Sequence, residues 1–364
     1  MVDIAKTFGH YWPEYQRLHG CKILPSHRAA VQAIISCRTG CLGGELYQCD
    51  CGEFQYSYHS CNNRACPKCG HQKASEWIER QRTRLLPAPY FMVTFTVPQE
   101  LRPLFKLHQK ELYSLLLRES AATLQDVAAN PEHWGVELGL LGVLHTWTRQ
   151  LNYHPHAHFI VPGGGLADNP VEWKPLPSPE FLLPVAVLSA RFRTRFKAAL
   201  STHSEWMAQI NPQIWNKSWV VHVKPVGSGE SALKYLSAYI YKTAITSQRI
   251  LADDGQNVTF AYRDSEDGQW RQAILPGVEF LERFLQHVLP RGFQRVRYYG
   301  WLSPAAKKRF DMIKRALNVK AVAPLPAKPI GPPLCPRCQK PMTLSATFGR
   351  GPPVGPLRFT RPSS

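Results

Sequence analysis

Acidic residues are scarce in this sequence. Its 364 residues include 26 Asp and Glu against 44 Lys and Arg, so the formal net charge at pH 7 is +18. A charge of this sign and size favours a polyanionic partner, and nucleic acid is the leading candidate. An anionic membrane surface is the alternative, but the sequence lacks the basic amphipathic helix with a clean apolar face that such a surface would require.

Long apolar runs are missing too. No stretch is apolar for long enough to span a bilayer, and the first residues, MVDIAKTFGHYWPEY, lack the basic and then apolar pattern of a signal peptide. No internal repeat is visible. We therefore expect a cytoplasmic protein without a membrane partner, and its length allows two or three domains.

Cysteine is missing from most of the chain. Of the 10 cysteines, all but two lie before residue 70, and the remaining pair, Cys335 and Cys338, follows more than 260 residues without any. In a reducing compartment such clustering indicates metal ligation rather than disulfides. The sequence therefore predicts a metal-binding module followed by a cysteine-free body. The pair in CPRC (335–338) supplies only half of a metal site, and the sequence leaves its role open.

The densest part of the cluster consists of CDC (49–51), Cys61 and CPKC (66–69). Cysteines two or three apart in a tight turn direct their sulfurs at one metal, and structural zinc takes four such ligands in a tetrahedron. Our first choice is one structural Zn²⁺ bound by Cys49, Cys51, Cys66 and Cys69. Cys61 either replaces one of these or helps to build a second site with His59, Cys37 or His71. Free buried cysteines are the less favoured alternative.

Two basic segments are candidate DNA-binding surfaces. The first surrounds the CPKC turn and contains Arg64, Lys68 and Lys73. The second, RGFQRVRYYG (291–300), mixes basic residues with aromatic ones, which suits stacking on unpaired bases. Its candidate contacts are Arg295, Arg297 and Tyr298. A basic amphipathic strand without a DNA contact explains this second segment equally well.

Hydrophobic periodicity predicts a mixture of helices and strands. The predicted helices are 72–86, 99–129, 185–210, 228–244 and 279–289. The predicted strands are 91–97, 142–147, 156–161 and 218–226, with a hairpin at 258–275. From about residue 320 proline and glycine dominate, which indicates a mostly unstructured tail.

Three histidines occupy alternate positions in YHPHAHFIV (153–161). Side chains alternate between the faces of a strand, so His156 and His158 lie on one face, about 7 Å apart along the backbone. Ala157 and Phe159 then face a core on the other side. His154 precedes a proline, and we expect it at the boundary of the strand.

Two or three imidazoles with open positions suit a catalytic divalent metal. His145, on the preceding predicted strand, is the candidate third ligand because it is close enough in sequence to be a cross-strand neighbour. Such a set could hold zinc with a water for hydrolysis, or Mg²⁺ or Mn²⁺ against a phosphodiester. Solvated or core histidines on an edge strand are the structural alternative.

The segment GSGESALKYLSAYIYKTAI (227–245) has the pattern of an amphipathic helix. Helical spacing gathers Tyr235, Tyr239 and Lys242 nearly opposite an apolar stripe. A phenolate can attack phosphorus, and a nearby lysine can stabilise the charge of an in-line transition state. Two amphipathic tyrosines that cover the edge of a core are the alternative.

Together these motifs resemble those of two-tyrosine rolling-circle transposases of bacterial insertion sequences, in the HUH endonuclease superfamily. The resemblance covers roughly residues 20–305 and depends on the order of its motifs. They are CRTGCLGGELYQCDCG (37–52), SCNNRACPKCG (60–70), FTVP (95–98), HPHAHFIVPGGGL (154–166), KYLSAYIYKTAI (234–245) and RFLQHVLPRGFQRVRYYGWL (283–302). CDC departs from the pattern, because many relatives have one more residue between these cysteines.

The resemblance implies an α+β fold, in which a small zinc-binding module precedes an HUH-type antiparallel sheet flanked by helices. It implies that His156 and His158 bind a catalytic Mg²⁺ or Mn²⁺, and that Tyr235 and Tyr239 are the nucleophiles. One tyrosine would cleave single-stranded DNA at a transposon end, leaving a 5′-phosphotyrosine and a free 3′-OH. The second would allow a further cleavage and strand transfer to target DNA, in a bacterial protein associated with the nucleoid.

Four parts of the chain follow from this interpretation. They are a zinc-binding, DNA-binding module with its exit helix (1–86), an HUH nuclease and strand-transferase domain (87–250), a C-terminal hairpin with a basic helical segment (251–319), and the Pro/Gly-rich tail (320–364). Three other functions stay open. A rolling-circle replication initiator or relaxase shares the chemistry, a zinc-dependent hydrolase would use only the histidines, and a zinc-finger DNA-binding protein would use neither histidines nor tyrosines.

Overall fold

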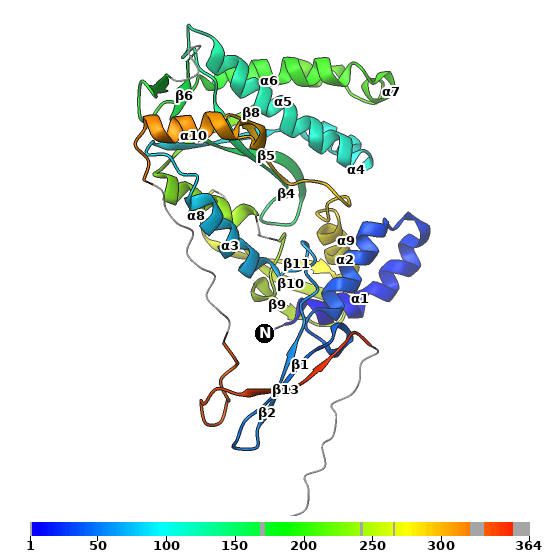
Figure 1. Cartoon of the computed structure of the whole chain (residues 1–364). Coiled ribbons are helices and arrows are strands. Elements are labelled where there is room, and N and C mark those ends of the chain that lie inside the picture. The colour runs from blue at the N-terminus through cyan, green and yellow to red at the C-terminus, as the bar shows by residue number, and fades with distance from the viewer. Residues whose placement is uncertain (1, 168–171, 241–242, 265, 321–330, 352–364) are drawn as a thin grey trace, which may run out of the picture. The chain divides into compact units, whose positions relative to one another are not determined.

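The computed structural model describes residues 2–167, 172–240, 243–264, 266–320 and 331–351, without the side chains of residues 70–74 and 235–240. The chain divides into two compact units (Figure 1). The first combines three segments, Met1–Lys73, Ile245–Glu282 and Pro326–Ser364. The second combines Ala74–Ala244 with Arg283–Leu325. Among the described residues, no helix has both the length and the apolar character needed to cross a membrane.

The second unit is built on a five-stranded sheet with the order β12–β4–β5–β3–β8, in which all neighbouring strands are antiparallel. Its strands are β3 (Tyr90–Thr96), β4 (Gly139–Trp147), β5 (Tyr153–Pro162), β8 (Val220–Gly227) and β12 (Val296–Gly300). These segments are rich in β-branched and aromatic residues, which favour a pleated, half-buried surface. The structure confirms the predicted α+β class with an antiparallel sheet flanked by helices.

Helices cover both faces of this sheet (Figure 1). On one face, Ala157 and Phe159 of β5 join the main core beneath α4 (Arg102–Leu107), α5 (Gln109–Ala129) and α6 (Val185–Leu200). On the other face, Ile160 of β5 packs with Trp77 of α3 (Gly70–Arg82) and Leu233 of α8 (Gly229–Ile240). Because side chains alternate along a strand, the histidine face of β5 is the face on which α8 packs.

Smaller elements complete the second unit. They are β6 (Gly164–Leu166), β7 (Trp173–Pro175), α7 (Ser204–Met207), α10 (Lys307–Ala316) and the 3₁₀ helices η3 (Gln99–Leu101), η4 (Pro212–Asn216) and η6 (Pro304–Ala306).

Phe159 tests the core beneath the histidine strand. Its ring is fully buried and meets the Phe95 ring edge-on at a centroid distance of 5.9 Å. Phe159→Ala should lower the free energy of unfolding of the second unit by about 3–5 kcal/mol, because a large buried ring leaves a cavity. Phe181→Ala, at a position with 57% exposure, should change it by less than about 0.5 kcal/mol. Equal losses in urea denaturation of the two variants would contradict this packing.

The first unit contains helices and two small sheets. The helices are α1 (Ile4–His19), α2 (Pro25–Ser36) and, as far as Glu282, α9 (Gly277–Leu285), with the 3₁₀ helices η1 (Gly20–Lys22), η2 (Gly40–Leu42) and η5 (Ser247–Arg249). One sheet has the order β11–β10–β9, and the other has the order β13–β1–β2. Their strands are β9 (Ile250–Asp253), β10 (Asn257–Arg263), β11 (Trp270–Pro276), β1 (Gly44–Gln48), β2 (Phe54–Tyr58) and β13 (Thr343–Phe348).

Two parts of this organisation differ from the sequence-based expectation. Residues 331–351, expected in an unstructured tail, include β13, which pairs with β1. The predicted hairpin region 251–319 is divided, because its hairpin belongs to the first unit and residues from 283 onward belong to the second. The composition of a segment says little about strand pairing with a distant part of the chain. The prediction of an unstructured segment from proline and glycine content was therefore wrong for β13.

Candidate metal centres and catalytic face

Three histidines converge on one face of the large sheet. The β4–β5 register places His145 directly opposite His156, as the sequence predicts, and His158 follows two residues later on the same face. One ring nitrogen from each of the three lies within 4.8 Å of the others. The ring centroids are 4.7 to 5.4 Å apart. The trio forms a compact cluster of nitrogen donors.

Hydrogen bonds and burial prepare these imidazoles to be ligands. His156 Nδ1 donates to the His154 carbonyl at 2.7 Å, which leaves the Nε2 lone pair of His156 available. His158 Nδ1 lies 2.9 Å from Thr94 Oγ1 on the neighbouring strand. Burial lowers the pKa of His156 to about 4 and the pKa of His158 well below its usual value. Both rings are therefore neutral at pH 7, which is the form that binds a metal.

Cationic side chains lie close to the trio. Arg295 donates from Nε to the Leu144 carbonyl at 3.0 Å and stacks over Trp147, with its guanidinium carbon 4.9 Å from the ring centroid. Its charge adds to the lowering of the pKa of His156 and His158, after burial. The predicted DNA contact Arg295 is therefore a neighbour of the histidine cluster.

His154 is the second residue of β5, which starts at Tyr153, so it lies at the start of a strand that begins three residues earlier than predicted. Arg102 Nη2 donates to His154 Nδ1 at 2.7 Å. An arginine has no acceptor, so this nitrogen of His154 carries its lone pair toward the guanidinium. A neutral ring then carries its proton on Nε2, so neither nitrogen of His154 is free to bind a metal, which agrees with its exclusion from the metal set.

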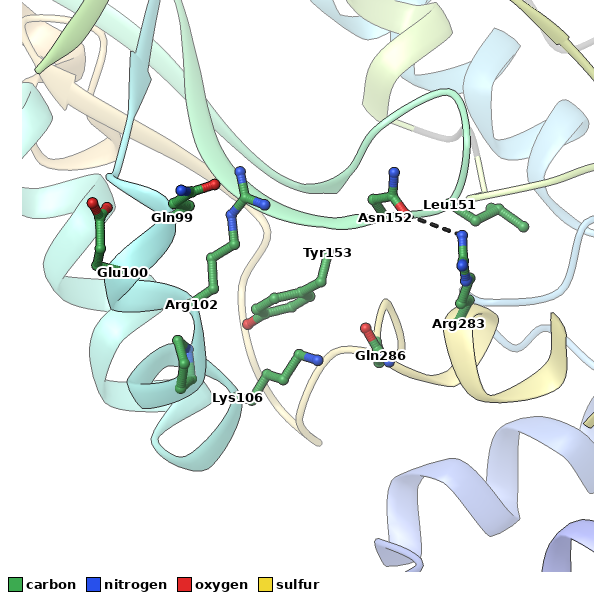
Figure 2. Close-up of a pocket in the computed structure, with 10 residues that line it drawn as sticks. Gln99, Glu100, Arg102, Lys106, Leu151, Asn152, Tyr153, Arg283 and Gln286 are labelled. Atoms are coloured by element: carbon green, nitrogen blue, oxygen red, sulfur yellow. Dashed lines mark hydrogen bonds between the residues drawn. The ribbon is translucent and has the colours of Figure 1, made fainter. Parts of the chain in front are cut away.

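A basic cavity of about 730 Å³ is lined by Arg102, the partner of His154, and by Tyr153 (Figure 2). Arg102 and Lys106 line it from α4, and Arg283 lines it while donating to Asn152 Oδ1 at 3.0 Å. Its one carboxylate, Glu100, is neutralised by Lys217 Nζ at 2.6 Å. The cavity is net positive, and sequence reasoning missed its residues because they come from separated segments.

The other residues of the predicted second basic segment point in different directions. Arg297 donates to Ser114 Oγ of α5 at 2.9 Å, and its guanidinium carbon lies 5.2 Å from the centroid of the Phe293 ring. Tyr298, on the other face of β12, packs beneath Arg84 at 4.6 Å. The strand therefore divides these two candidates between the faces of the sheet.

The structure describes only some of the remaining predicted DNA contacts and nucleophiles. Lys68 forms an ion pair with Asp3 at 2.8 Å, and Arg64 is exposed. Tyr235 and Tyr239 belong to the backbone of α8, but their side chains, like that of Lys73 in α3, lie outside the described residues. Lys242 also lies outside them.

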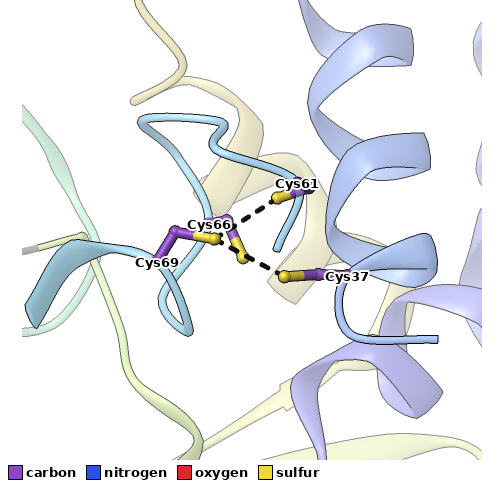
Figure 3. A group of neighbouring side chains, drawn as sticks. All are labelled: Cys37, Cys61, Cys66 and Cys69. Carbon is purple, nitrogen blue, oxygen red and sulfur yellow. Dashed lines mark hydrogen bonds between the residues drawn. The ribbon is translucent and has the colours of Figure 1, made fainter. Parts of the chain in front are cut away.

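In the first unit, Cys37, Cys61, Cys66 and Cys69 form a four-thiol cluster (Figure 3). Cys37 follows α2, and CPKC leads into α3. The Cys69 sulfur lies 3.5 Å from that of Cys37 and 3.6 Å from that of Cys61. Four sulfurs at about 2.3 Å from a tetrahedral zinc are about 3.8 Å apart, so the cluster fits one structural zinc ion. A hydrogen bond from the Cys66 thiol lowers the pKa of Cys61 to about 5, which favours a thiolate there.

The cysteines thus separate differently from our first choice of a single site. Cys66 and Cys69 assemble with Cys37 and Cys61, whereas Cys49 and Cys51 lie with Cys335 and Cys338. All ten cysteines are free, and sulfur distances of 3.4 Å and more are too long for a disulfide. Cys335 and Cys338 were assigned to no site from the sequence. The sequence gives one indication of their role, because CDC and CPRC each supply half of a tetrahedral ligand set.

The chain matches two known protein families. Residues 139–309 match the Y2 family described as "Putative transposase", and residues 7–97 match the family "Transposase zinc-binding domain". These ranges contain the histidine trio and the Cys37 cluster, respectively. The match and the thiol geometry together support structural zinc in the first unit.

Individual relatives agree with these families. The chain is 36% identical over 321 residues to the "Putative transposase y4qJ" of Sinorhizobium fredii, covering 82% of this chain and 80% of that protein. It is 30% identical over 315 residues to the transposase for insertion sequence element IS801 of Pseudomonas savastanoi pv. phaseolicola, covering 81% of this chain and 75% of that protein. The chain therefore belongs to the two-tyrosine transposases of bacterial insertion sequences, as its sequence motifs predict.

Proposed function

We propose that this transposase cleaves and rejoins single-stranded DNA at insertion-sequence ends through 5′-phosphotyrosine intermediates, in rolling-circle transposition. The observation that carries the proposal is the shared sheet face of the histidine trio and α8. Ala232 of α8 is buried in the same cluster as Ile160, which follows His158 by two residues on β5. Leu233 is buried in the same cluster. At 100° per residue, positions 235 and 239 lie within about 60° of position 232, on the side of the helix that points away from Leu233.

The chemistry divides between the trio and the tyrosines. A divalent ion held by His145, His156 and His158 would polarise a scissile phosphate. The oxygen of Tyr235 or Tyr239 forms a bond to phosphorus as the bond to the 3′ oxygen breaks. The phenolic proton goes to solvent, and the leaving strand keeps a free 3′-OH. Because a phosphodiester replaces a phosphodiester, a 3′-OH can later displace the tyrosine and rejoin DNA, and Lys242 would stabilise the charge of both steps.

Imidazole ligands bear on the choice of metal. Mg²⁺ prefers oxygen ligands, whereas affinity for nitrogen donors rises from Mn²⁺ along the transition-metal series. We therefore expect Mn²⁺ to support half-maximal cleavage at a lower concentration than Mg²⁺, by about 10-fold or more. Titration of each ion in a cleavage assay measures this, and a preference for Mg²⁺ would argue against an all-histidine site.

The positive charge of the basic cavity supports the proposal that the substrate is single-stranded DNA. Lys106→Ala should lower the slope of log affinity against log salt by about 0.7, the value for one lost phosphate contact on a single strand. Lys174→Ala, which removes an exposed lysine from β7, is the matched control and should leave the slope unchanged. Fluorescence anisotropy with a labelled oligonucleotide measures both, and equal slopes for the two variants would remove the cavity from the DNA path.

Incubation with single-stranded DNA of an element end and Mn²⁺ tests the proposal as a whole. We expect a covalent protein–DNA adduct on denaturing gels and a product with a free 3′-OH. A zinc-dependent hydrolase would yield cleavage by water without an adduct, and a DNA-binding protein without catalysis would yield neither. A replication initiator or relaxase would also form the adduct, but the sequence family favours the transposase.

A further inference from the structure

The C-terminal pair Cys335 and Cys338 meets CDC (49–51) in the first unit. β13 pairs with β1 from Gly44 opposite Phe348 to Gln48 opposite Thr343, which brings the two cysteine-bearing turns to the same end of the sheet. The backbones of the two segments approach each other closely at Gly43, where an added Cβ would lie only 2.5 Å from the Phe348 carbonyl oxygen. The strand pairing therefore places the turn with Cys335 and Cys338 next to the CDC turn.

The sulfur geometry of this pair of turns matches that of the Cys37 cluster. The Cys49 and Cys338 sulfurs are 3.4 Å apart, and those of Cys51 and Cys335 are 3.5 Å apart. All four lie within 4.8 Å of one another. These distances approach the spacing of about 3.8 Å expected around a tetrahedral zinc ion.

Both turns have backbones bent to direct sulfurs at one point. Gly52 donates its N–H to the Cys49 carbonyl and has a φ of +87°. Gln339 donates to the Cys335 carbonyl and has a φ of +59°, an unusual conformation for a residue with a side chain. Cys335 also donates to the Lys340 carbonyl, which closes its turn. Each turn thus contributes two sulfurs to a group in which all four lie close together.

The sheet β13–β1–β2 has little apolar material of its own beside these turns. The buried cluster here consists of Cys49, Cys335 and Met342, with Tyr47 and Cys338 partly buried beside it. Most of β13 is exposed. Small modules that cannot build a sufficient core commonly need a metal or a disulfide to fold, and the sulfur distances exclude the disulfide.

We propose that Cys49, Cys51, Cys335 and Cys338 bind a second structural zinc ion, which fastens residues 331–351 onto the N-terminal module. Four thiolates select a soft, tetrahedral ion such as zinc over Mg²⁺ or Mn²⁺. The site needs ligands from both ends of the chain, and the matched zinc-binding domain, residues 7–97, contains only half of it. It is independent of the nuclease chemistry proposed above.

Cobalt substitution of the full chain tests this site. Thiolate-to-Co²⁺ charge transfer reports cysteine ligation, so ions at the histidine trio do not contribute. We expect saturation at two thiolate-bound ions per chain. In Cys335→Ser/Cys338→Ser the amplitude of the charge-transfer absorbance at saturation should be two-fold lower. Cys37→Ser/Cys61→Ser should also halve the amplitude. Cys21→Ser/Cys41→Ser, which alters cysteines outside both clusters, should leave it unchanged.

A second variant guards against misfolding. Cys338→His keeps a zinc ligand and should retain two zinc ions per chain by native mass spectrometry in a His156→Ala background, whereas Cys335→Ser/Cys338→Ser should retain one. Hydrogen exchange at the β13 amides should accelerate only in the serine variant. One thiolate-bound ion in the unmodified chain, or an unchanged amplitude in Cys335→Ser/Cys338→Ser, would overturn the proposal.

Discussion

His156→Ala is expected to lower the rate of single-strand cleavage by about 10³-fold, while affinity for single-stranded DNA changes little. His156 lies opposite His145 and on the same face as His158, so its removal leaves only two of the three imidazoles proposed to hold the metal. Metal polarisation of a phosphate contributes several kcal/mol to a transition state, and about 4 kcal/mol corresponds to about 10³-fold. Single-turnover cleavage at saturating protein measures this loss without interference from binding.

Two variants define what this result means. His203→Ala removes an exposed imidazole at the start of α7, off the sheet that carries the trio, and its rate should stay within about two-fold of the unmodified chain, as expected of a surface substitution. Thr94→Val removes the hydroxyl beside His158 Nδ1 and should weaken metal activation by about 10–100-fold. Excess Mn²⁺ should restore the cleavage rate of Thr94→Val but not that of His156→Ala. This outcome would mean that Thr94 orients a metal ligand, whereas His156 is itself a ligand. Full activity of His156→Ala would exclude the trio as the metal site.

Tyr235→Phe/Tyr239→Phe is expected to abolish the covalent adduct, a loss limited only by the sensitivity of the assay. Phenylalanine keeps the ring and removes the oxygen that would attack phosphorus, so folding and DNA binding should be preserved. Either single substitution should still allow one cleavage but block a second transfer from the same chain. Labelled oligonucleotides separate these events, because the first yields an adduct and the second a joined strand.

Tyr298→Phe is the matched control for the tyrosine pair. It removes one hydroxyl in the same unit and keeps the ring that packs beneath Arg84. Adduct formation by Tyr298→Phe should equal that of the unmodified chain. An adduct in Tyr235→Phe/Tyr239→Phe would place the nucleophile elsewhere, whatever its rate.

Local periodicity accounts for what could be predicted of the catalytic face. A strand has a period of two, so HPHAHF places His156 and His158 on one face and Ala157 and Phe159 in the core, as observed. The link from His145 to His156 was predictable because a short connection joins their strands. The strand start at Tyr153 was missed because it depends on the pairing of Tyr153 with Trp147 of β4, across an irregularity in the register that the sequence does not reveal.

Distant contacts account for what could not be predicted. The CDC turn and the CPKC turn are neighbours in sequence, and proximity along the chain favoured a shared zinc ion. The structure instead pairs CDC with Cys335 and Cys338, through a strand whose surroundings are rich in proline and glycine. Such pairing depends on backbone hydrogen bonds and sulfur positions, which leave no periodic trace in either segment.

Mapping the attachment site of the DNA adduct tests the central claim most directly. The adduct formed on a single-stranded element end is digested with protease and nuclease, and the modified peptide is sequenced by tandem mass spectrometry. The account predicts a nucleotide joined through its 5′ phosphate to Tyr235 or Tyr239. Attachment to any other residue, or cleavage with no attached nucleotide at all, would contradict it.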